Sequence, residues 1–190
     1  TVNVNILGTY EVRYNVSDSS GNTATEVVRT VEVVDTTAPV ITLTGASTTT
    51  HEGATPYIDA GATASDIVDG NLTGSITTSS DVNVSAEGAY SVTYSVTDIS
   101  LNTATATRSV EVVDTTIPII TLTGSSTITL EFGSAYVDEG ATASDTLDGN
   151  ITGSIATSSN VNTNALGTYT VRYNVSDNAS NPADEVTRTV

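Results

Sequence analysis

Apolar and polar residues alternate with a period of two along one segment of this chain, and that segment occurs three times. From Tyr90 to Val96, tyrosine and valine alternate with serine and threonine. Such alternation is typical of a β-strand that turns one face toward a core. Residues 10–16 and 169–175 follow the same pattern. No stretch sustains the apolar spacing of an amphipathic helix, so we expect an all-β fold.

Short segments rich in β-branched residues predict further strands in the middle of the chain. They cover residues 40–44, 57–64, 72–77, 82–85 and 104–113. Glycine, aspartate and asparagine, which favour turns, separate these segments. Together with the alternating segment they make about seven short strands, the number expected for an immunoglobulin-like β-sandwich.

A tyrosine follows a glycine by two residues at the start of each alternating segment. These residues are Tyr10, Tyr90 and Tyr169. A tyrosine corner occupies this position in immunoglobulin-like domains, where its hydroxyl bonds to the backbone a few residues upstream. An ordinary buried aromatic residue is the alternative interpretation.

The sequence repeats itself about every 79 residues, since Val33–Gly45 returns with few changes as Val112–Gly124. Self-similarity of this kind indicates one structural unit copied in series. We therefore expect an elongated array of tandem immunoglobulin-like domains. Its parts are a partial repeat of C-terminal strands at residues 1–34 and two further repeats at residues 35–113 and 114–190. Because Thr1 aligns with positions inside the later repeats, we expect a segment or processed product of a longer protein.

The net charge of the chain limits the kinds of molecule that it could bind. The chain has 22 acidic residues against five arginines and no lysine, a net charge of −17. Nucleic-acid binding needs a basic surface, so we expect no nucleic-acid partner. No apolar run approaches the roughly 18 residues of a membrane span, so we expect no membrane insertion. The chain has no cysteine, and disulfide bonds therefore cannot stabilise these small domains.

The acidic residues suggest a metal site when they are placed on the predicted sandwich. If the strands are connected as in an immunoglobulin domain, three segments lie at the same end, or pole, of the sandwich. They are the segment before the first strand, the loop between the second and third strands, and the loop between the last two strands. These segments carry Asp35, Asp66, Asp69 and Asp98 in repeat 35–113, and Asp114, Asp145, Asp148 and Asp177 in repeat 114–190. At an effective dielectric constant near 20, two such charges about 4 Å apart repel by on the order of 4 kcal/mol.

A bound cation would relieve that repulsion. Ca²⁺ is the predicted cofactor, because it binds 6–8 oxygen ligands in flexible geometry. Mg²⁺ demands stricter octahedral geometry, and zinc finds no cysteine and only one histidine, His51. The competing interpretation is that each aspartate simply favours a turn.

Other charged residues recur without such convergence. Asp59 and Asp138 lie early in a predicted strand and are weaker candidate ligands. Glu52 and Glu131 occupy equivalent positions near the opposite pole. They are either solvated surface charges or residues that could reach the ion of the next repeat. The aligned arginines Arg29, Arg108 and Arg188 are expected to pair with surface carboxylates.

The connection between repeats is short, so consecutive repeats must abut. Val33–Pro39 contains no glycine, and Pro39 and Pro118 restrict the backbone on either side of them. A cation at this pole would tie the linker aspartate to two loops and limit bending between neighbouring repeats.

These features resemble the tandem bacterial immunoglobulin-like repeats, of the HYR-like and cadherin-like kind, of large surface and secreted proteins. The resemblance rests on Asp-Thr-Thr-x-Pro-x-Ile-Thr-Leu, on Asp-Gly-Asn and on Gly-x-Tyr-x-Val-x-Tyr-x-Val-x-Asp, which recur in both larger repeats. It implies an extracellular module of the bacterial cell surface, often calcium-dependent. Residues 1–34 carry only the last of these motifs.

Three function classes follow from these features. The leading one is a structural or adhesive array, a calcium-rigidified rod or a component of a surface layer or filament. Its partners are neighbouring repeats of the same chain, and lateral assembly of chains stays open. The alternative is a carbohydrate- or ligand-binding accessory module of a secreted enzyme. Catalysis is not expected, because without cysteine or lysine and with one histidine no nucleophile and base can be paired.

Overall fold

The computed structural model describes all residues from 1 to 190. It contains β-strands and two short 3₁₀ turns, η1 (Thr73–Ser75) and η2 (Thr152–Ser154), so the predicted all-β class is confirmed. No helix has the length and apolar character needed to cross a membrane. The chain forms two compact units, and the long strands of repeat 35–113 contribute to both. Unit 1 comprises Thr1–Ser47, Ala60–Ser79 and Thr93–Arg108, and unit 2 comprises Thr48–Asp59, Ser80–Val92 and Ser109–Val190.

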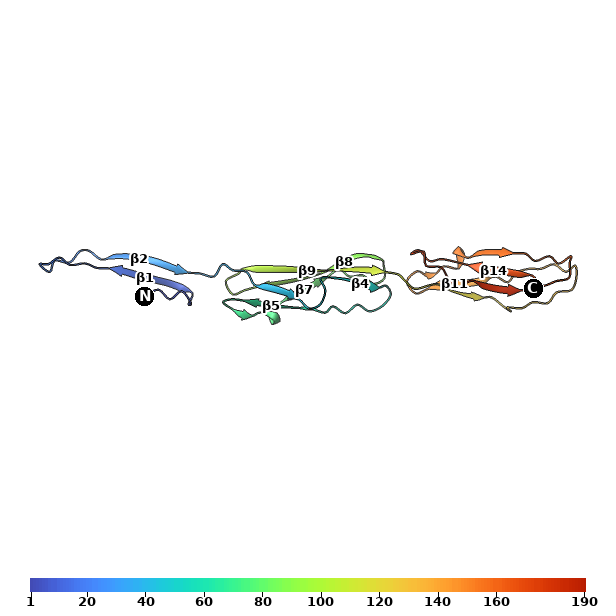
Figure 1. Ribbon diagram of the computed structural model, residues 1–190, viewed down its shortest axis with the longest axis horizontal. Helices are drawn as coiled ribbons and strands as arrows, with labels where there is room; N and C mark the ends of the chain where they lie inside the picture. The colour runs from blue at the N-terminus through green and yellow to red at the C-terminus, as the bar shows by residue number, and fades with distance from the viewer. The chain divides into compact units, whose positions relative to one another are not determined.

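Repeat 35–113 has seven strands in two sheets, the plan of an immunoglobulin-like β-sandwich. One sheet joins three strands in antiparallel order: β3 (Val40–Leu43), β5 (Ala62–Asp66) and β6 (Gly70–Asn71). The other has the order β4 (Thr48–Glu52), β9 (Thr103–Val113), β8 (Gly88–Thr97) and β7 (Thr77–Ser80) (Figure 1). β4 runs parallel to β9, from Thr48 opposite Ser109 to Glu52 opposite Val113. Alternate side chains of β8 are almost fully buried, as the period-two pattern predicts.

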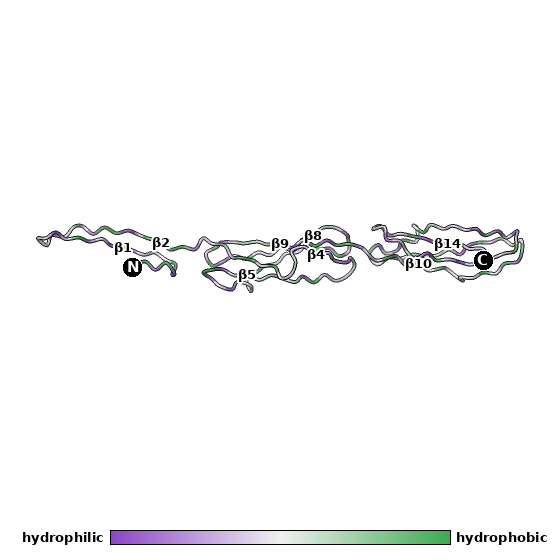
Figure 2. Tube along the Cα trace, in the orientation of Figure 1, coloured by the Kyte–Doolittle hydropathy of each residue, from purple (hydrophilic) through white to green (hydrophobic).

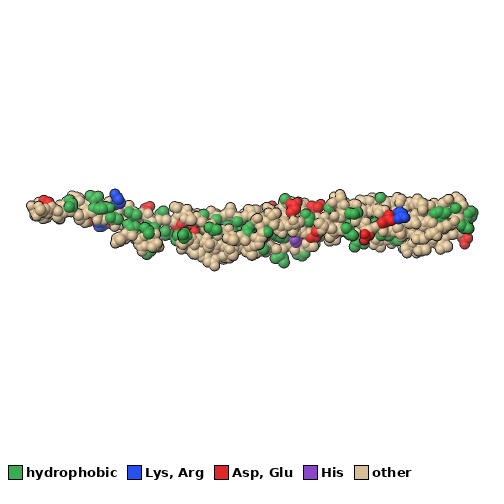
Figure 3. All heavy atoms as spheres, viewed as in Figure 1, with side chains coloured by type: hydrophobic (Ala, Val, Ile, Leu, Met, Phe, Trp, Pro, Cys, Tyr) green, Lys and Arg blue, Asp and Glu red, His purple; other side chains and the backbone are tan.

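Residues 1–34 form an antiparallel hairpin of β1 (Gly8–Tyr14) and β2 (Val27–Val33). None of these residues is buried, although the hairpin carries the same alternating pattern as β8 (Figure 2). Tyr14 is 48% exposed, whereas its counterpart Tyr94 is 1% exposed. Figure 3 shows apolar side chains on the surface of this hairpin. The period of two therefore specifies the strand, but burial requires the strands that cover its apolar face.

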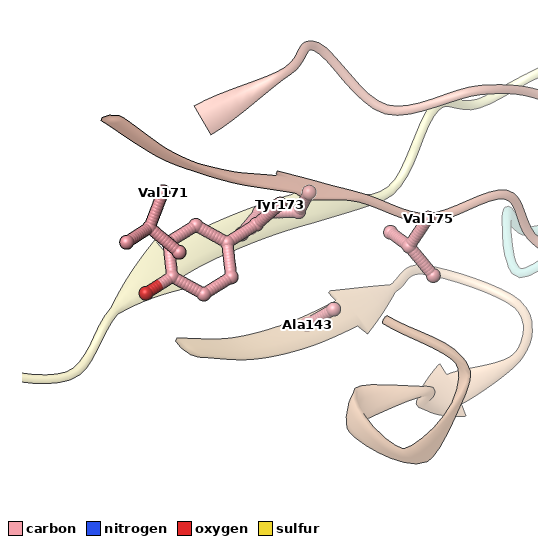
Figure 4. Packing of buried hydrophobic residues seen from close by; sticks show 5 residues of the cluster. Ala143, Val171, Tyr173 and Val175 are labelled. Carbon is pink, nitrogen blue, oxygen red and sulfur yellow. The ribbon is translucent and has the colours of Figure 1, made fainter. Parts of the chain in front are cut away.

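Repeat 114–190 builds two sheets of three strands each. The first contains β10 (Ile119–Leu122), β11 (Ala141–Asp145) and β12 (Gly149–Asn150), and the second contains β13 (Ala156–Ser159), β14 (Thr170–Asn174) and β15 (Val186–Thr189). Side chains from both sheets form one core cluster of Ile120, Ala143, Val171, Tyr173 and Val175 (Figure 4). This core holds the strand ends from which the loops of the candidate site emerge.

Three strand predictions were wrong in position or kind. The strand expected over residues 57–64 is β5, five residues shorter at its start and two longer at its end. The segment 72–77 contains the 3₁₀ turn η1 and only the first residue of β7. The segment 82–85 forms no strand, because the side chain and carbonyl of Asn83 accept hydrogen bonds from Ser85 and Ala86 and close a turn. β4 was not predicted, since its polar sequence shows no alternation.

The tyrosine corner is present in all three repeats. The Tyr90 hydroxyl donates to the carbonyl oxygen of Ala86 at 3.0 Å, and Tyr169 donates to Ala165 at 3.0 Å. In the hairpin, Tyr10 donates to Ile6 at 2.8 Å. Each bond spans four residues and ties the loop before the strand to the strand itself.

We expect the change Tyr90→Phe to lower the free energy of unfolding by about 0.5–1.5 kcal/mol, the net value of one hydrogen bond. The ring stays in place, and the Ala86 carbonyl loses its donor. Urea unfolding followed by circular dichroism measures the change. Tyr169→Phe removes the equivalent bond and should cost a similar amount, and unchanged midpoints in both variants would contradict a stabilising corner.

Candidate metal centres

Cluster 1 consists of Asp35, Asp66 and Asp98, whose carboxylate oxygens approach to within 4.8 Å of one another. All three residues belong to unit 1. Asp35 lies between β2 and β3, Asp66 is the last residue of β5, and Asp98 follows β8. Asp66 and Asp98 are buried, and Asp35 is half-buried. Three segments far apart in the sequence therefore bring three carboxylates to one place.

Cluster 2 repeats this arrangement with Asp114, Asp145 and Asp177, also within 4.8 Å of one another and all within unit 2. Asp114 follows β9, Asp145 ends β11, and Asp177 lies in the loop after β14. All three are buried, with 6–9% of their surface exposed. The same three strand ends thus supply the acids in both repeats.

Local turns orient the aspartates that end β5 and β11. One carboxylate oxygen of Asp66 accepts hydrogen bonds from the amides of Val68 at 2.7 Å and Asp69 at 3.0 Å. These two amides lower the pKa of Asp66 below its ordinary value. Gly70 completes the turn with a φ of 74°, a conformation that favours glycine.

Asp145 makes the equivalent bonds, to the amides of Leu147 at 2.7 Å and Asp148 at 3.1 Å. Burial works to raise the pKa of Asp145, but the backbone amides outweigh it and the pKa is lowered. Asp66 and Asp145 are therefore held as carboxylates at neutral pH. Each keeps a second oxygen that its turn does not use.

The second oxygens of several cluster aspartates have no hydrogen-bond partner. The Oδ2 atoms of Asp35, Asp66 and Asp114 are buried and unpaired. A buried unpaired polar atom is costly, and an unpaired charge is more so. These oxygens belong to residues whose other oxygen is fixed by a turn or by a neighbouring threonine. They are the atoms that a cation could coordinate.

The hairpin loop contributes an asparagine that sequence reasoning did not include among the ligands. The amide nitrogen of Asn181 donates to Asp177 Oδ2 at 2.9 Å and to the Asp114 carbonyl at 3.0 Å. Asn102 makes the corresponding bonds to Asp98 at 2.8 Å and to the Asp35 carbonyl at 3.4 Å. The recurrence of Asp-x-x-x-Asn is the sequence signal of this bridge between loop and linker.

Thr116 is a second residue that sequence reasoning missed. Its hydroxyl donates to Asp114 Oδ1 at 2.7 Å and lies 3.4 Å from Asp145 Oδ2. Thr37 stands at the same place in cluster 1 and donates its amide to Asp35 at 3.0 Å. The recurring Asp-Thr-Thr motif therefore places a threonine beside the linker aspartate.

Asp69 and Asp148 lie outside the clusters. Asp69 Oδ2 accepts the amide of Ile99 at 2.8 Å, and Asp148 accepts both the amide and the side-chain nitrogen of Asn178 at 2.7 Å. These bonds join two loops of the same pole. A role for Asp69 and Asp148 as ligands stays a prediction, and their observed contacts are structural.

Glu52 contacts the segment that carries the first acid of cluster 2. Its two carboxylate oxygens accept the amide of Thr115 at 2.9 Å and the Thr115 hydroxyl at 2.7 Å. These bonds lower the pKa of Glu52. Glu52 therefore orders the linker beside cluster 2, and a role as a ligand of an ion there stays a prediction.

The arginines were expected to pair with surface carboxylates, and this is wrong for two of them. Arg108 is 3% exposed and Arg188 is fully buried. Arg188 forms an ion pair with Asp138 and donates to the carbonyls of Thr123, Ser125 and Gly140. Arg108 donates to the carbonyls of Thr44, Ala46 and Gly61. Each guanidinium group therefore donates to three backbone carbonyls inside its repeat.

The pairing of Asp138 has a measurable pH dependence. Burial works to raise the pKa of Asp138, but hydrogen bonds from Tyr173 and Tyr136 and the charge of Arg188 hold it below the ordinary 3.8. Ionised Asp138 therefore contributes its full stabilisation of the folded state at pH values above the ordinary pKa of 3.8. This contribution is lost as the pH falls through the lowered pKa of the folded state. We expect the stability gap between the wild type and Asp138→Asn to be constant from pH 7 to about pH 5 and to narrow below about pH 4.

Urea midpoints of the two proteins at pH 6 and pH 3 measure this gap, and contributions from all other carboxylates cancel in the difference. A gap that stays constant down to pH 3 would contradict the ionised pairing.

The chemistry of both clusters fits a hard cation. Each offers three carboxylates, backbone carbonyls and a nearby threonine or asparagine, and none contains a soft ligand. Ca²⁺ prefers such oxygen ligands, whereas zinc and copper prefer nitrogen and sulfur.

The sequence matches a protein-family model described as bacterial surface protein, Ig-like domain. The match covers residues 1–33, 41–112 and 120–190, which corresponds to the three repeats. An uncharacterised 81.3 kDa protein of Acholeplasma phage L2 is 38% identical over 121 residues. That alignment covers 60% of this chain and 16% of the phage protein.

Solved structures give weaker similarities. The CBM51-2 and INT domains of Clostridium perfringens ZmpB, in complex with GlcNAc, align with 28% identity and a TM-score of 0.34 over 45% of this chain and 20% of that chain. The ZmpB M60 catalytic domain with its two CBM51 domains aligns with 16% identity and a TM-score of 0.45 over 99% of this chain and 33% of that chain. A lipoprotein of Bacteroides thetaiotaomicron aligns with 15% identity and a TM-score of 0.37, over 79% of this chain and 99% of that chain.

Proposed function

Because this chain belongs to the bacterial surface protein Ig-like domain family, we propose that it is a calcium-dependent structural or adhesive array. The family supports an extracellular surface or accessory module without catalytic activity of its own. Within that class, the finer role proposed is to hold consecutive immunoglobulin-like domains in a defined relation through bound Ca²⁺. The proposal covers two forms of the array: one that presents an adhesive domain, and one that assembles laterally with other chains.

The observation that carries the proposal is the pair of buried three-carboxylate clusters. An exposed acidic cluster is common and needs no ion, because water screens its charges. Here five of the six aspartates are buried, and three Oδ2 atoms lack any partner. Removing such charges from water without compensation is unfavourable. A divalent cation would compensate most of that charge.

The ion proposed is Ca²⁺, with Asp35, Asp66 and Asp98 as ligands in cluster 1, and Asp114, Asp145 and Asp177 in cluster 2. Ca²⁺ accepts 6–8 oxygens in irregular geometry, which three carboxylates and nearby carbonyls and waters can supply. Mg²⁺ requires near-ideal octahedral geometry and gives up its water reluctantly.

The position of the linker aspartates connects ion binding to the arrangement of repeats. Asp35 and Asp114 lie in the segments that lead from one repeat into the next, between β2 and β3 and between β9 and β10. The other ligands in each cluster come from the repeat that follows. Ion binding would therefore fix the linker to that repeat and restrict its backbone.

Isothermal titration of the chelator-treated chain with CaCl₂ tests the proposal. We expect two bound ions per chain, and a melting temperature that rises with calcium and falls again in EGTA, because a ligand of the folded state stabilises it. MgCl₂ at the same concentration is the control and should stabilise less. The absence of binding at millimolar Ca²⁺, or a melt unaffected by EGTA, would refute the calcium role and leave the family assignment intact.

The contribution of Asp69 and Asp148 is tested separately. Asp69→Asn combined with Asp148→Asn should leave the stoichiometry at two, because both residues bond to neighbouring loops. A loss of either ion in this double variant would restore them to the ligand set.

A further inference from the structure

Two residues at the end of β4 contact cluster 2 from the preceding repeat. Glu52 is the last residue of β4, and Gly53 follows it. β4 pairs with the end of β9, and the Gly53 amide donates to the carbonyl of Val113 at 2.7 Å. Both residues are therefore held beside the strand that leads into the linker. They belong to unit 2, as do all three aspartates of cluster 2.

The first contact is with the linker that carries Asp114. The carboxylate oxygens of Glu52 accept the amide of Thr115 at 2.9 Å and its hydroxyl at 2.7 Å. Glu87, a further residue of repeat 35–113 in unit 2, accepts the amide of Asp114 itself at 3.4 Å. Two carboxylates of the preceding repeat thus bind two consecutive amides of the linker. The backbone position of Asp114 depends on these bonds.

The second contact is with the turn that orients Asp145. The Leu147 amide in this turn donates to Asp145 Oδ1 at 2.7 Å. Gly53 is buried, and a Cβ atom added to it would lie 3.0 Å and 3.1 Å from the two methyl carbons of Leu147. The φ angle of Gly53 is not in the left-handed region that favours glycine. The close approach of Leu147 is therefore the feature that requires a glycine here.

Gly53 and Leu147 are matched to each other in this pair of repeats. Phe132 occupies the position of Gly53 in repeat 114–190, and Val68 occupies the position of Leu147 in repeat 35–113. A phenylalanine at position 53 would overlap the space that Leu147 fills, because even a Cβ atom there is crowded. The contact thus depends on which residue each repeat carries at its end.

We propose, on the basis of the calcium site proposed above, that Glu52 and Gly53 are positioning residues for the ion in cluster 2. The calcium affinity of this cluster then depends on the end of the preceding repeat. Glu52 holds the linker beside Asp114, and Gly53 leaves space for Leu147, whose turn holds Asp145. Neither residue has to ligate the ion for this role. Because such coupling is reciprocal, a bound ion would also strengthen the contact between the two repeats.

The geometry of cluster 2 makes it sensitive to small displacements. Its carboxylate oxygens already lie within 4.8 Å of one another, and the buried Oδ2 of Asp114 has no hydrogen-bond partner. Ca²⁺ binds its oxygen ligands at about 2.3–2.6 Å, so the oxygens must converge further on one point. A side chain at position 53 would push Leu147 and its turn away from Gly53. That displacement would move Asp145 relative to Asp114.

The change Gly53→Val tests the steric contact. We expect it to weaken calcium binding at cluster 2 by about tenfold, which corresponds to about 1.4 kcal/mol, and to leave cluster 1 unchanged. Titration of the ¹⁵N-labelled chain with CaCl₂ measures both sites in one sample. The amides of Thr116 and Leu147 report on cluster 2, and those of Thr37 and Val68 report on cluster 1.

A second substitution separates crowding from a general loss of structure. Leu147→Ala removes the methyl groups that a valine at position 53 would meet. The double variant Gly53→Val with Leu147→Ala should therefore regain much of the affinity that Gly53→Val loses, because residues in contact are not additive. A double variant that binds calcium at cluster 2 as weakly as the product of the two single effects would overturn the role of the contact.

Variants of Glu52 test the contact with the linker. Glu52→Ala should weaken calcium binding at cluster 2 by about tenfold. Glu52→Gln should retain most of the affinity, because its amide oxygen can still accept the Thr115 amide. Glu111→Ala is the control for lost charge, because Glu111 is an exposed residue of β9 outside both clusters. Equal losses in Glu52→Ala and Glu52→Gln would show that charge matters and would overturn the positioning role of Glu52.

The titrations distinguish this inference from the calcium role itself. A wild-type chain that binds no ion at either cluster would overturn both. A wild-type chain that binds two ions, with Gly53→Val and Glu52→Ala equally tight at cluster 2, would overturn the positioning role alone. Weakening of both clusters by the same factor would also overturn it, because the two residues contact only cluster 2 and its flanking segments.

Discussion

Replacing Arg188 by alanine should lower the free energy of unfolding of repeat 114–190 by about 3–5 kcal/mol, the usual cost of breaking a buried ion pair by removing one partner. The guanidinium group is fully buried, pairs with Asp138, and donates to three backbone carbonyls. Its carbon lies 5.8 Å from the centre of the Tyr173 ring. The substitution removes the charged partner of Asp138, which keeps its hydrogen bonds from Tyr136 and Tyr173. It also removes one donor from each of the three carbonyls and opens a cavity beside the core.

Arg172→Ala provides the matched control in the same repeat. Arg172 pairs with Glu185 at the surface, where the two side chains are 53% and 39% exposed. An exposed pair of this kind contributes about 0–1 kcal/mol. Urea unfolding monitored by near-ultraviolet circular dichroism of the tyrosines measures both variants.

Arg188→Met separates the two causes, because methionine fills much of the space but restores no charge. If lost packing dominates, methionine should recover most of the stability; if the unpaired polar groups dominate, it should recover little, and the latter is expected. A cost for Arg188→Ala no greater than that for Arg172→Ala would contradict the buried role of Arg188.

The change Asp114→Asn should reverse its effect on stability according to whether calcium is present. In EGTA it removes one of three carboxylates within 4.8 Å of one another. At that separation, two unit charges repel by about 1–4 kcal/mol for effective dielectric constants from 80 to 20, so the variant should be more stable than the wild type. The asparagine oxygen can still accept the Thr116 amide and hydroxyl, which bond to Asp114 Oδ1.

With Ca²⁺ at about 100 times its dissociation constant, the wild type should gain about 2.7 kcal/mol from each site. The variant lacks one charged ligand and should lose most of that gain in cluster 2, so it becomes the less stable protein. Melting curves of both proteins in EGTA and in CaCl₂ measure the reversal.

Asp184→Asn is the control for charge alone, because Asp184 is exposed and lies outside both clusters. Its small effect should have the same sign in both solutions. An Asp114→Asn variant that is less stable than the wild type in EGTA would contradict the repulsion on which the calcium proposal rests.

Several features of the fold and the site could be predicted from the sequence because they depend on local pattern. Tyrosine and valine alternate through β8, and this period of two predicts a strand with one buried face. The recurrence of Asp-Thr-Thr and of Gly-x-Tyr predicted the repeats and the tyrosine corners. Placing the strands in immunoglobulin order then predicted which loops share a pole, and three aspartates of each predicted set do meet there.

Other features depend on neighbours that the sequence does not reveal. Asp66 and Asp69 are only three residues apart, yet only Asp66 joins cluster 1, because Asp69 is bonded to the amide of Ile99. The polar strand β4 forms through pairing with β9 and not through its own pattern.

The sequence by itself thus determined the all-β class, the repeats and the loops that carry acidic residues, since these follow from periodicity and from copied motifs. Only the tertiary structure decided which carboxylate oxygens converge unpaired and that Arg108 and Arg188 lie inside the repeats. The physical reason is that a charged side chain's position depends on the hydrogen bonds available around it. Those partners come from segments up to about 65 residues away, such as the carbonyl of Thr123 for Arg188.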